Sequence, residues 1–63
     1  MGEVIKKLRK RAKMTQHELA ELIGVKQATI SLYETGKRKI DINTAQKIAI
    51  ALEVSLDELF HGI

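Results

Sequence analysis

The 63-residue chain contains no cysteine, no proline and no tryptophan, and it has only one tyrosine and one phenylalanine. Without cysteine it can form neither a disulfide nor a thiolate metal site. If Tyr33 and Phe60 are both buried, no aromatic platform is left for stacking single-stranded nucleic acid, which makes RNA a weaker candidate partner. No linker, repeat or low-complexity segment interrupts the chain. We therefore expect a single domain over residues 1–63.

Long apolar runs are also missing. No stretch approaches the roughly 18 residues that a membrane-spanning helix needs, and the N-terminus lacks the apolar segment of a signal peptide. We therefore expect a cytoplasmic protein with no membrane partner.

Motifs for catalysis or for small ligands are equally scarce. His17-Glu18 resembles the start of a HExxH zinc motif, but Glu21 stands where the second histidine should be. Glu18 is also explained as part of a helix cap. We expect no metal, cofactor, small-molecule ligand or catalytic residue, and the chain is not predicted to be an enzyme.

Capping signals and helical periodicity predict an all-α fold of five short helices. Two capping boxes, Thr15 with Glu18 and Ser55 with Glu58, mark the starts of the second and fifth helices. Asp41 is the expected cap of the fourth helix, with Asn43 as the alternative. Glycines at 24 and 36 are expected to end the second and third. The predicted helices span about residues 3–13, 16–23, 27–34, 42–52 and 55–61.

Apolar residues at helical spacing predict the buried face of each helix. Met14 with Leu19, and Val54 with Leu59, are expected to pack as hydrophobic staples at two helix starts. The other expected core positions are Val4, Ile5, Leu8, Ala12, Ala20, Leu22, Ile23, Val25, Ile30, Tyr33, Ile42, Ala45, Ile48, Ala49, Ala51 and Leu52.

Residues 15–36 are the most informative segment, because they predict two short helices joined by a tight glycine turn. The outer face of the second of these helices carries small, hydrogen-bonding and apolar groups but no charge. Its members are Gln27, Ala28, Ser31, Leu32 and Thr35. Such a face indicates a contact surface rather than an ordinary solvated one.

Charge is unevenly distributed along the chain. Residues 1–39 hold ten Lys/Arg and four Asp/Glu, a net +6, whereas residues 40–63 hold one and four, a net −3. A domain with one positive end suits a polyanion such as nucleic acid. Three basic residues directly follow the exposed helix, at positions 37–39. For Lys6, Lys7, Lys10 and Arg11, a solvated helix face is an equally good explanation.

A co-linear set of segments covers most of the chain: Ile5, Leu8–Arg9, Thr15–Gln16, Glu18–Ala20, Gly24–Val25, Gln27, Thr29–Ser31, Glu34, Gly36–Arg38, Ile48–Ala49, Ala51–Leu52 and Val54–Phe60. Through these segments, about residues 3–60 resemble the DNA-binding domains of the phage repressor and Cro family. The resemblance implies a compact five-helix, lambda-repressor-like domain in which the second and third helices form a helix-turn-helix. It implies binding to double-stranded DNA with the third helix in the major groove.

Base contacts are expected from the outer face of the third helix. The amide of Gln27 can pair with adenine N6 and N7, while Ala28 and Leu32 can contact thymine methyl groups. Ser31 can reach a base or a phosphate. Many relatives carry a long polar or basic side chain where Leu32 stands, so their base preferences do not transfer, and a bystander or partner contact stays open for Leu32.

The resemblance also implies phosphate contacts and one structural pair. Arg9 and Glu34 match an ion pair between the first and third helices that fixes the angle of the third helix. Gln16 is expected to contact a phosphate and to brace Gln27. The full set of expected phosphate-binding residues is Gln16, Lys26, Thr29, Thr35, Lys37, Arg38 and Lys39.

These observations predict a sequence-specific regulator, a repressor that binds a palindromic operator as a homodimer. Phe60 and Ile63 form the candidate dimer surface, with sealing of the core as the alternative role. A protein-interaction module of the same fold, of the antitoxin or bridging-factor type, is the alternative function. In that case Ala28 and Leu32 would be an apolar docking spot.

Overall fold

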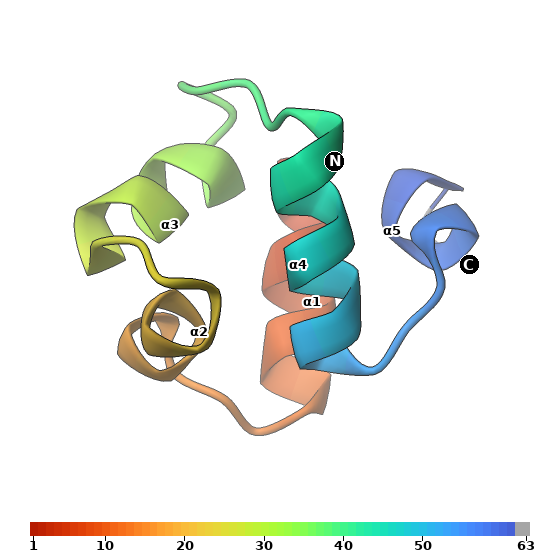
Figure 1. The fold of residues 1–63 in the computed structure, drawn as a ribbon, viewed down its shortest axis with the longest axis horizontal. Coiled ribbons are helices and arrows are strands. Elements are labelled where there is room, and N and C mark those ends of the chain that lie inside the picture. Colours follow the sequence, from red (N-terminus) through yellow and green to blue (C-terminus); the bar gives the residue numbers. More distant parts are fainter. Residues whose placement is uncertain (62–63) are drawn as a thin grey trace.

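The computed structural model describes residues 1–61, which form five α-helices connected by short loops (Figure 1). No strand occurs in this part of the chain, as predicted. Among these same residues, no helix is long and apolar enough to cross a membrane. The helices are α1 (Gly2–Arg11), α2 (Gln16–Ile23), α3 (Gln27–Glu34), α4 (Ile42–Leu52) and α5 (Leu56–His61).

Side-chain caps start three helices where the sequence predicts them. Thr15 Oγ1 accepts a hydrogen bond from the Glu18 N–H at 3.0 Å, and Glu18 Oε1 accepts one from the Thr15 N–H at 2.8 Å. The same reciprocal pair links Ser55 and Glu58 at α5. At α4, Oδ1 of Asp41 accepts a bond from the Thr44 N–H at 2.7 Å, which identifies Asp41 as the cap.

The ends of α1–α4 share one backbone device, a residue in the left-handed conformation just beyond the helix. Gly24 and Gly36 both have φ 75°, while Lys13 and Glu53 have φ 58° and 57°. The next N–H then donates to a carbonyl oxygen in the last turn, which satisfies groups that a helix end leaves free. Through this device α1 ends at Arg11, before the predicted end. The bonds run from Met14 to Arg9, Val25 to Ala20, Lys37 to Leu32 and Val54 to Ala49.

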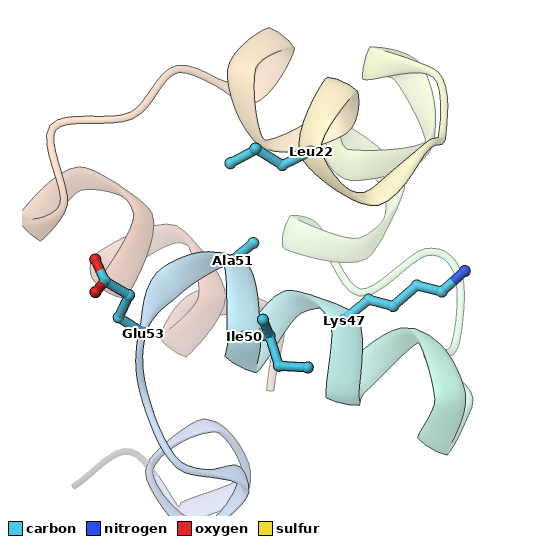
Figure 2. A pocket seen from close by; sticks show the side chains of 5 residues that line it. All are labelled: Leu22, Lys47, Ile50, Ala51 and Glu53. Carbon is cyan, nitrogen blue, oxygen red and sulfur yellow. The ribbon is translucent and has the colours of Figure 1, made fainter.

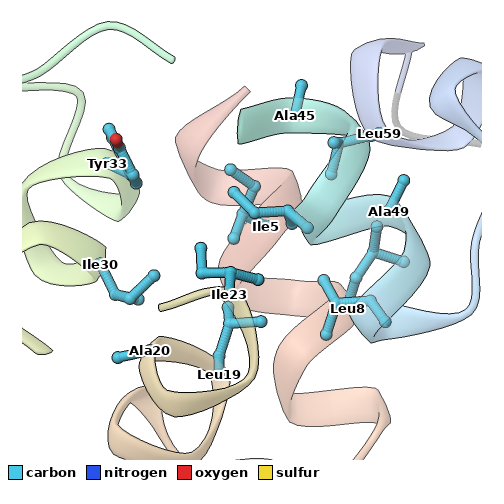
Figure 3. Close-up of a cluster of buried hydrophobic side chains, with 12 residues drawn as sticks. Ile5, Leu8, Leu19, Ala20, Ile23, Ile30, Tyr33, Ala45, Ala49 and Leu59 are labelled. Atoms are coloured by element: carbon cyan, nitrogen blue, oxygen red, sulfur yellow. The ribbon is translucent and has the colours of Figure 1, made fainter. Parts of the chain in front are cut away.

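The apolar faces of the five helices meet in one core (Figure 3). Each helix contributes one large side chain that is completely buried: Ile5, Leu19, Ile30, Ile48 and Leu59. The staple residues Met14 and Val54 pack against this cluster from its rim. Because every helix supplies a central side chain, no helix can leave without opening the core.

Three predicted core positions are wrong. Ala12 follows the last residue of α1 and is exposed. Leu22 is 62% exposed and Ile42 53% exposed. In a domain this small, α2 packs on α3 and α4, and α4 packs on α2 and α5, so neighbours cover only part of each helix. The apolar stripe in the sequence is therefore wider than the covered face.

Lys13→Gly is expected to raise the free energy of unfolding by about 1 kcal/mol, because glycine adopts the left-handed conformation without a Cβ clash. Lys10→Gly is the matched control, since it removes the same charge from inside α1. It should lower the free energy of unfolding by roughly 0.5–1 kcal/mol. Urea denaturation of both variants measures these changes. If Lys13→Gly instead lowers the free energy of unfolding, the left-handed conformation of Lys13 does not cost the stability that this prediction assumes.

Candidate nucleic-acid interface

A buried ion pair joins α1 to α3. Arg9 Nε lies 2.6 Å from Glu34 Oε2, and Arg9 Nη2 donates to Glu34 Oε1 at 3.1 Å, so the guanidinium and the carboxylate face each other with two parallel bonds. Only 8% of Arg9 and 6% of Glu34 is exposed. The ion pair implied by the family resemblance is therefore present between the two helices.

Two more hydrogen bonds extend this pair into a network. Arg9 Nη1 donates to the carbonyl oxygen of Met14 at 2.8 Å, in the loop before α2. Gln16 Nε2 donates to Glu34 Oε1 at 3.0 Å from the first turn of α2. We call Arg9, Gln16 and Glu34 the Arg9 network. It ties α1, the loop and α2 to the last residue of α3.

The contact made by Gln16 differs from the expected one. Its amide nitrogen bonds to Glu34, and within residues 1–61 it makes no hydrogen bond to Gln27. The amide has two N–H donors, so one is left for a phosphate. Gln16 and Glu34 are 18 residues apart. No local sequence pattern indicates a contact over this separation, because it depends on how the turn between α2 and α3 places the two helices.

The Arg9 network also shifts the pKa values of its two ionisable members, Arg9 and Glu34. Burial disfavours the ionised form of Glu34, but the hydrogen bonds from Arg9 and Gln16 outweigh this effect, and the pKa of Glu34 lies below its ordinary value. The hydrogen bond to Glu34 raises the pKa of Arg9. Both groups are therefore charged at neutral pH.

A close backbone approach fixes α3 at the same end. A Cβ atom at Gly2 would clash with the backbone carbonyl oxygens of Tyr33 and Glu34, so the first turn of α1 lies directly against the last turn of α3. Ile30 and Tyr33 are buried on the inner side of α3. The helix is thus held by apolar packing along its inner face and by polar bonds at its C-terminal end.

This anchoring leaves the predicted base-contacting side of α3 accessible. Gln27, Ala28 and Leu32 are exposed, while Ser31 is half-buried. The capping residue of α3 is Lys26, whose side chain makes no capping bond, unlike the capping side chains at α2 and α4. The first backbone N–H groups of α3 are therefore available to an anion.

The segment after α3 folds back on the helix. Thr35 Oγ1 donates to the carbonyl oxygens of Ser31 at 2.9 Å and Leu32 at 3.3 Å. The backbone N–H groups of Lys37 and Arg38 also donate to the Leu32 carbonyl oxygen, at 3.0 and 3.3 Å. These bonds place the exposed side chains at 37–39 beside the C-terminal end of α3. The Thr35 hydroxyl would have to give up an internal bond to donate to a phosphate.

The remaining candidate residues are less closely grouped. Thr29 is half-buried in the first turn of α3. Arg11 lies 3.7 Å from the carboxylate of Glu58 in α5, so it has a partner within the domain. Phe60 is 42% exposed on α5, whereas the other residue of the predicted dimer surface, Ile63, lies outside the described residues.

These features define the class of the protein: a small all-α domain whose second and third helices form a helix-turn-helix. A family model described as "Helix-turn-helix" matches residues 5–59, and the chain belongs to this family.

The chain is also similar to individual proteins of known sequence. It is 40% identical over 61 residues to YqaE of Bacillus subtilis (strain 168), an HTH-type transcriptional regulator, a match that covers 97% of this chain and 53% of YqaE. It is 39% identical over 56 residues to the antitoxin HipB of Escherichia coli (strain K12), which covers 89% of this chain and 64% of HipB. The chain thus spans only part of the length of these relatives.

A solved structure confirms the expected fold. The P22 c2 repressor, crystallised in complex with a synthetic operator, matches with a TM-score of 0.89 and 31% sequence identity. The match covers 98% of this chain and 94% of that chain. The resemblance to phage repressors is therefore confirmed by both sequence and structure.

Glu34→Gln is expected to lower the free energy of unfolding at pH 7 by about 3–5 kcal/mol, because it leaves the buried Arg9 without its counter-charge. The double variant Arg9→Met/Glu34→Leu removes both charges and should be more stable than Glu34→Gln. Urea denaturation compares the two. If both variants lose the same free energy of unfolding, leaving the Arg9 guanidinium without a counter-charge does not destabilise the fold.

The same double variant tests the acid response. Since the pKa of Glu34 is lower in the folded than in the unfolded chain, its stabilisation is complete above the unfolded pKa of about 4.3 and is lost as the pH falls below it. Backbone hydrogen bonds also lower the pKa values of Glu18 and Asp41. The wild type should therefore lose stability in acid, and the double variant should lose less. If the free energy of unfolding falls equally steeply with pH in both proteins, Glu34 does not contribute to the loss of stability in acid.

Proposed function

We propose that this chain is a sequence-specific, double-stranded DNA-binding transcriptional regulator, a repressor that binds a palindromic operator as a homodimer. In this proposal α3 lies in the major groove and α2 crosses the phosphate backbone. One observation carries it: α3 presents an exposed face without charge, between Lys26 and the basic residues 37–39, while the Arg9 network holds its C-terminal end. The likeness to a repressor solved in complex with a synthetic operator supports double-stranded DNA as the partner.

Base recognition is assigned to the N-terminal and middle part of α3. Gln27 offers a donor and an acceptor on one planar group, which fits the Hoogsteen edge of adenine. Ala28 and Leu32 add apolar contact one turn apart, which fits thymine methyl groups better than the polar edge of guanine. Ser31 is the half-buried member of the set. The expected target is therefore rich in A·T pairs.

Phosphate contacts position α3 from its two ends. Lys26 and the uncapped N-terminus supply positive potential at one end, and Lys37, Arg38 and Lys39 supply it at the other. The free N–H of Gln16, with Thr29 and Thr35, completes the proposed phosphate-binding set. These contacts carry no base preference and set the register of the helix on the duplex.

Homodimerisation supplies the specificity that one helix lacks. A single α3 covers too few base pairs, whereas two copies on half-sites one helical turn apart, about 34 Å, double the number of recognised bases. Phe60 on α5 is the proposed centre of this pairing surface. Selection of binding sites from random duplex DNA tests the whole proposal. A palindrome with half-sites one turn apart is expected, and an absence of enrichment would overturn it.

Gln27→Ala is expected to lose roughly 1–3 kcal/mol of binding free energy at one base pair of each half-site and to relax discrimination there. Gln46→Ala, at an exposed position on α4, is the matched control. Binding titrations with a panel of single-base operator variants measure both proteins. Unchanged base preference in Gln27→Ala would remove this residue from the base-contacting set.

Lys37→Ala is expected to weaken binding to all duplex sequences about equally and to lower the slope of log K against log salt by about one. The reason is that one counterion-releasing phosphate contact is lost. Titrations of specific and random duplexes over a range of salt concentrations provide the measurement. A loss confined to the specific site would instead place Lys37 on a base.

Similarity to the antitoxin HipB favours a second candidate, a protein-interaction role in which Ala28 and Leu32 dock on a protein. The salt dependence of partner binding separates the two functions. DNA binding falls steeply as salt rises, whereas an apolar protein contact is little affected.

A further inference from the structure

A surface groove between α2 and α4 is lined by residues to which the proposed DNA contacts assign no role. Leu22, Ile50 and Ala51 form its apolar floor, and Lys47 and Glu53 complete the lining (Figure 2). Ile50 is 77% exposed, the highest value among the large hydrophobic side chains of residues 1–61, and Leu22 is second. Phe60 is not part of this groove.

The charges of the groove are arranged symmetrically about Ile50. Lys47 precedes Ile50 by three residues within α4, and Glu53, the residue just beyond the end of the helix, follows Ile50 by three. By the helical rise, their Cα atoms lie about 4.5 Å before and after that of Ile50 along the axis of α4. Figure 2 shows the two charged ends pointing away in opposite directions, with Ile50 and Ala51 between them. Neither Lys47 nor Glu53 has an ion-pair partner within residues 1–61.

This spacing is self-complementary. If two copies pack with their α4 helices antiparallel and a two-fold axis at Ile50, each Lys47 faces Glu53 of the partner subunit, and both ion pairs form at once. The two Ile50 side chains then cover each other, and each Leu22 gains apolar cover. This charge complementarity of the surface with itself is the reason for choosing a second copy as the occupant.

We propose that the groove between α2 and α4 binds a second copy of this chain through antiparallel α4 helices. This surface is separate from Phe60 on α5, so the two can be used together, and operator-bound dimers can join to one another. Five residues line the groove, whereas a standard interface has about 20–30 residues on each side. The association is therefore expected to be weak in solution and to become significant where neighbouring DNA sites raise the local concentration.

Sedimentation velocity of the full chain without DNA, from about 10 μM to about 1 mM, tests the interface. The sedimentation coefficient of the wild type should rise with concentration. Ile50→Ala should weaken association at least about tenfold. Ile42→Ala is the matched control, because Ile42 is an exposed isoleucine of the same helix that lies outside the groove, and it should behave as the wild type.

A charge exchange tests the antiparallel geometry. Lys47→Glu or Glu53→Lys alone sets like charges against each other twice in the dimer, so each single variant should associate at least about tenfold more weakly. The double variant Lys47→Glu/Glu53→Lys restores opposite charges at both ends, and its association should return to within about threefold of the wild type. Circular dichroism confirms that all variants remain helical.

Four results would overturn the proposal. The first three are a wild type that stays monomeric throughout, an association that Ile50→Ala does not weaken more than Ile42→Ala, and a double exchange that fails to rescue association. If Phe60→Ala alone abolishes association, the interface lies on α5. That outcome rejects the α4 pairing but leaves the proposed operator-binding homodimer intact. Site selection on random DNA addresses the proposed function separately.

Discussion

The carboxylate of Glu34 is the group on which the orientation of α3 depends. It accepts hydrogen bonds from Arg9 of α1 and Gln16 of α2, so this one side chain of α3 connects three helices. A buried ion pair is weak evidence for stability, because desolvation opposes the attraction. Apolar packing at Ile30 and Tyr33 supplies most of the cohesion but tolerates small rotations. The hydrogen bonds of the Arg9 network are directional, so they fix the angle of α3 relative to α1 and α2.

Helix starts could be predicted from the sequence because their causes are local. The Thr15–Glu18 and Ser55–Glu58 boxes involve residues three apart, and the structure contains both pairs of bonds. Helix ends were predicted less uniformly: glycine marks those of α2 and α3, the end of α4 at Leu52 was predicted without one, and α1 ends before the predicted residue. Lys13 and Glu53 adopt the same left-handed conformation as the glycines, yet nothing in their side chains signals it. There the chain accepts local strain to complete a turn that the core requires.

Contacts between distant residues could not be derived from periodicity. The Arg9–Glu34 pair was expected only through the resemblance to phage repressors, and the bond from Gln16 to Glu34 was not expected at all. Apolar spacing predicted α4 well but overstated the buried face of α2 and α4, since Leu22 and Ile42 are exposed. Spacing shows which side of a helix is apolar, whereas the width of the covered side depends on how its neighbours are placed.

The side chains that anchor α3 and those that it exposes are different sets. Ile30, Tyr33 and Glu34 hold the helix, while Gln27, Ala28 and Leu32 contribute little to the core. The exposed set can therefore vary during evolution while the anchoring set stays constant, with changes in stability limited to helix propensity, about 0–0.7 kcal/mol per ordinary residue. A scaffold organised in this way allows duplicated copies to acquire new targets without first acquiring a new fold.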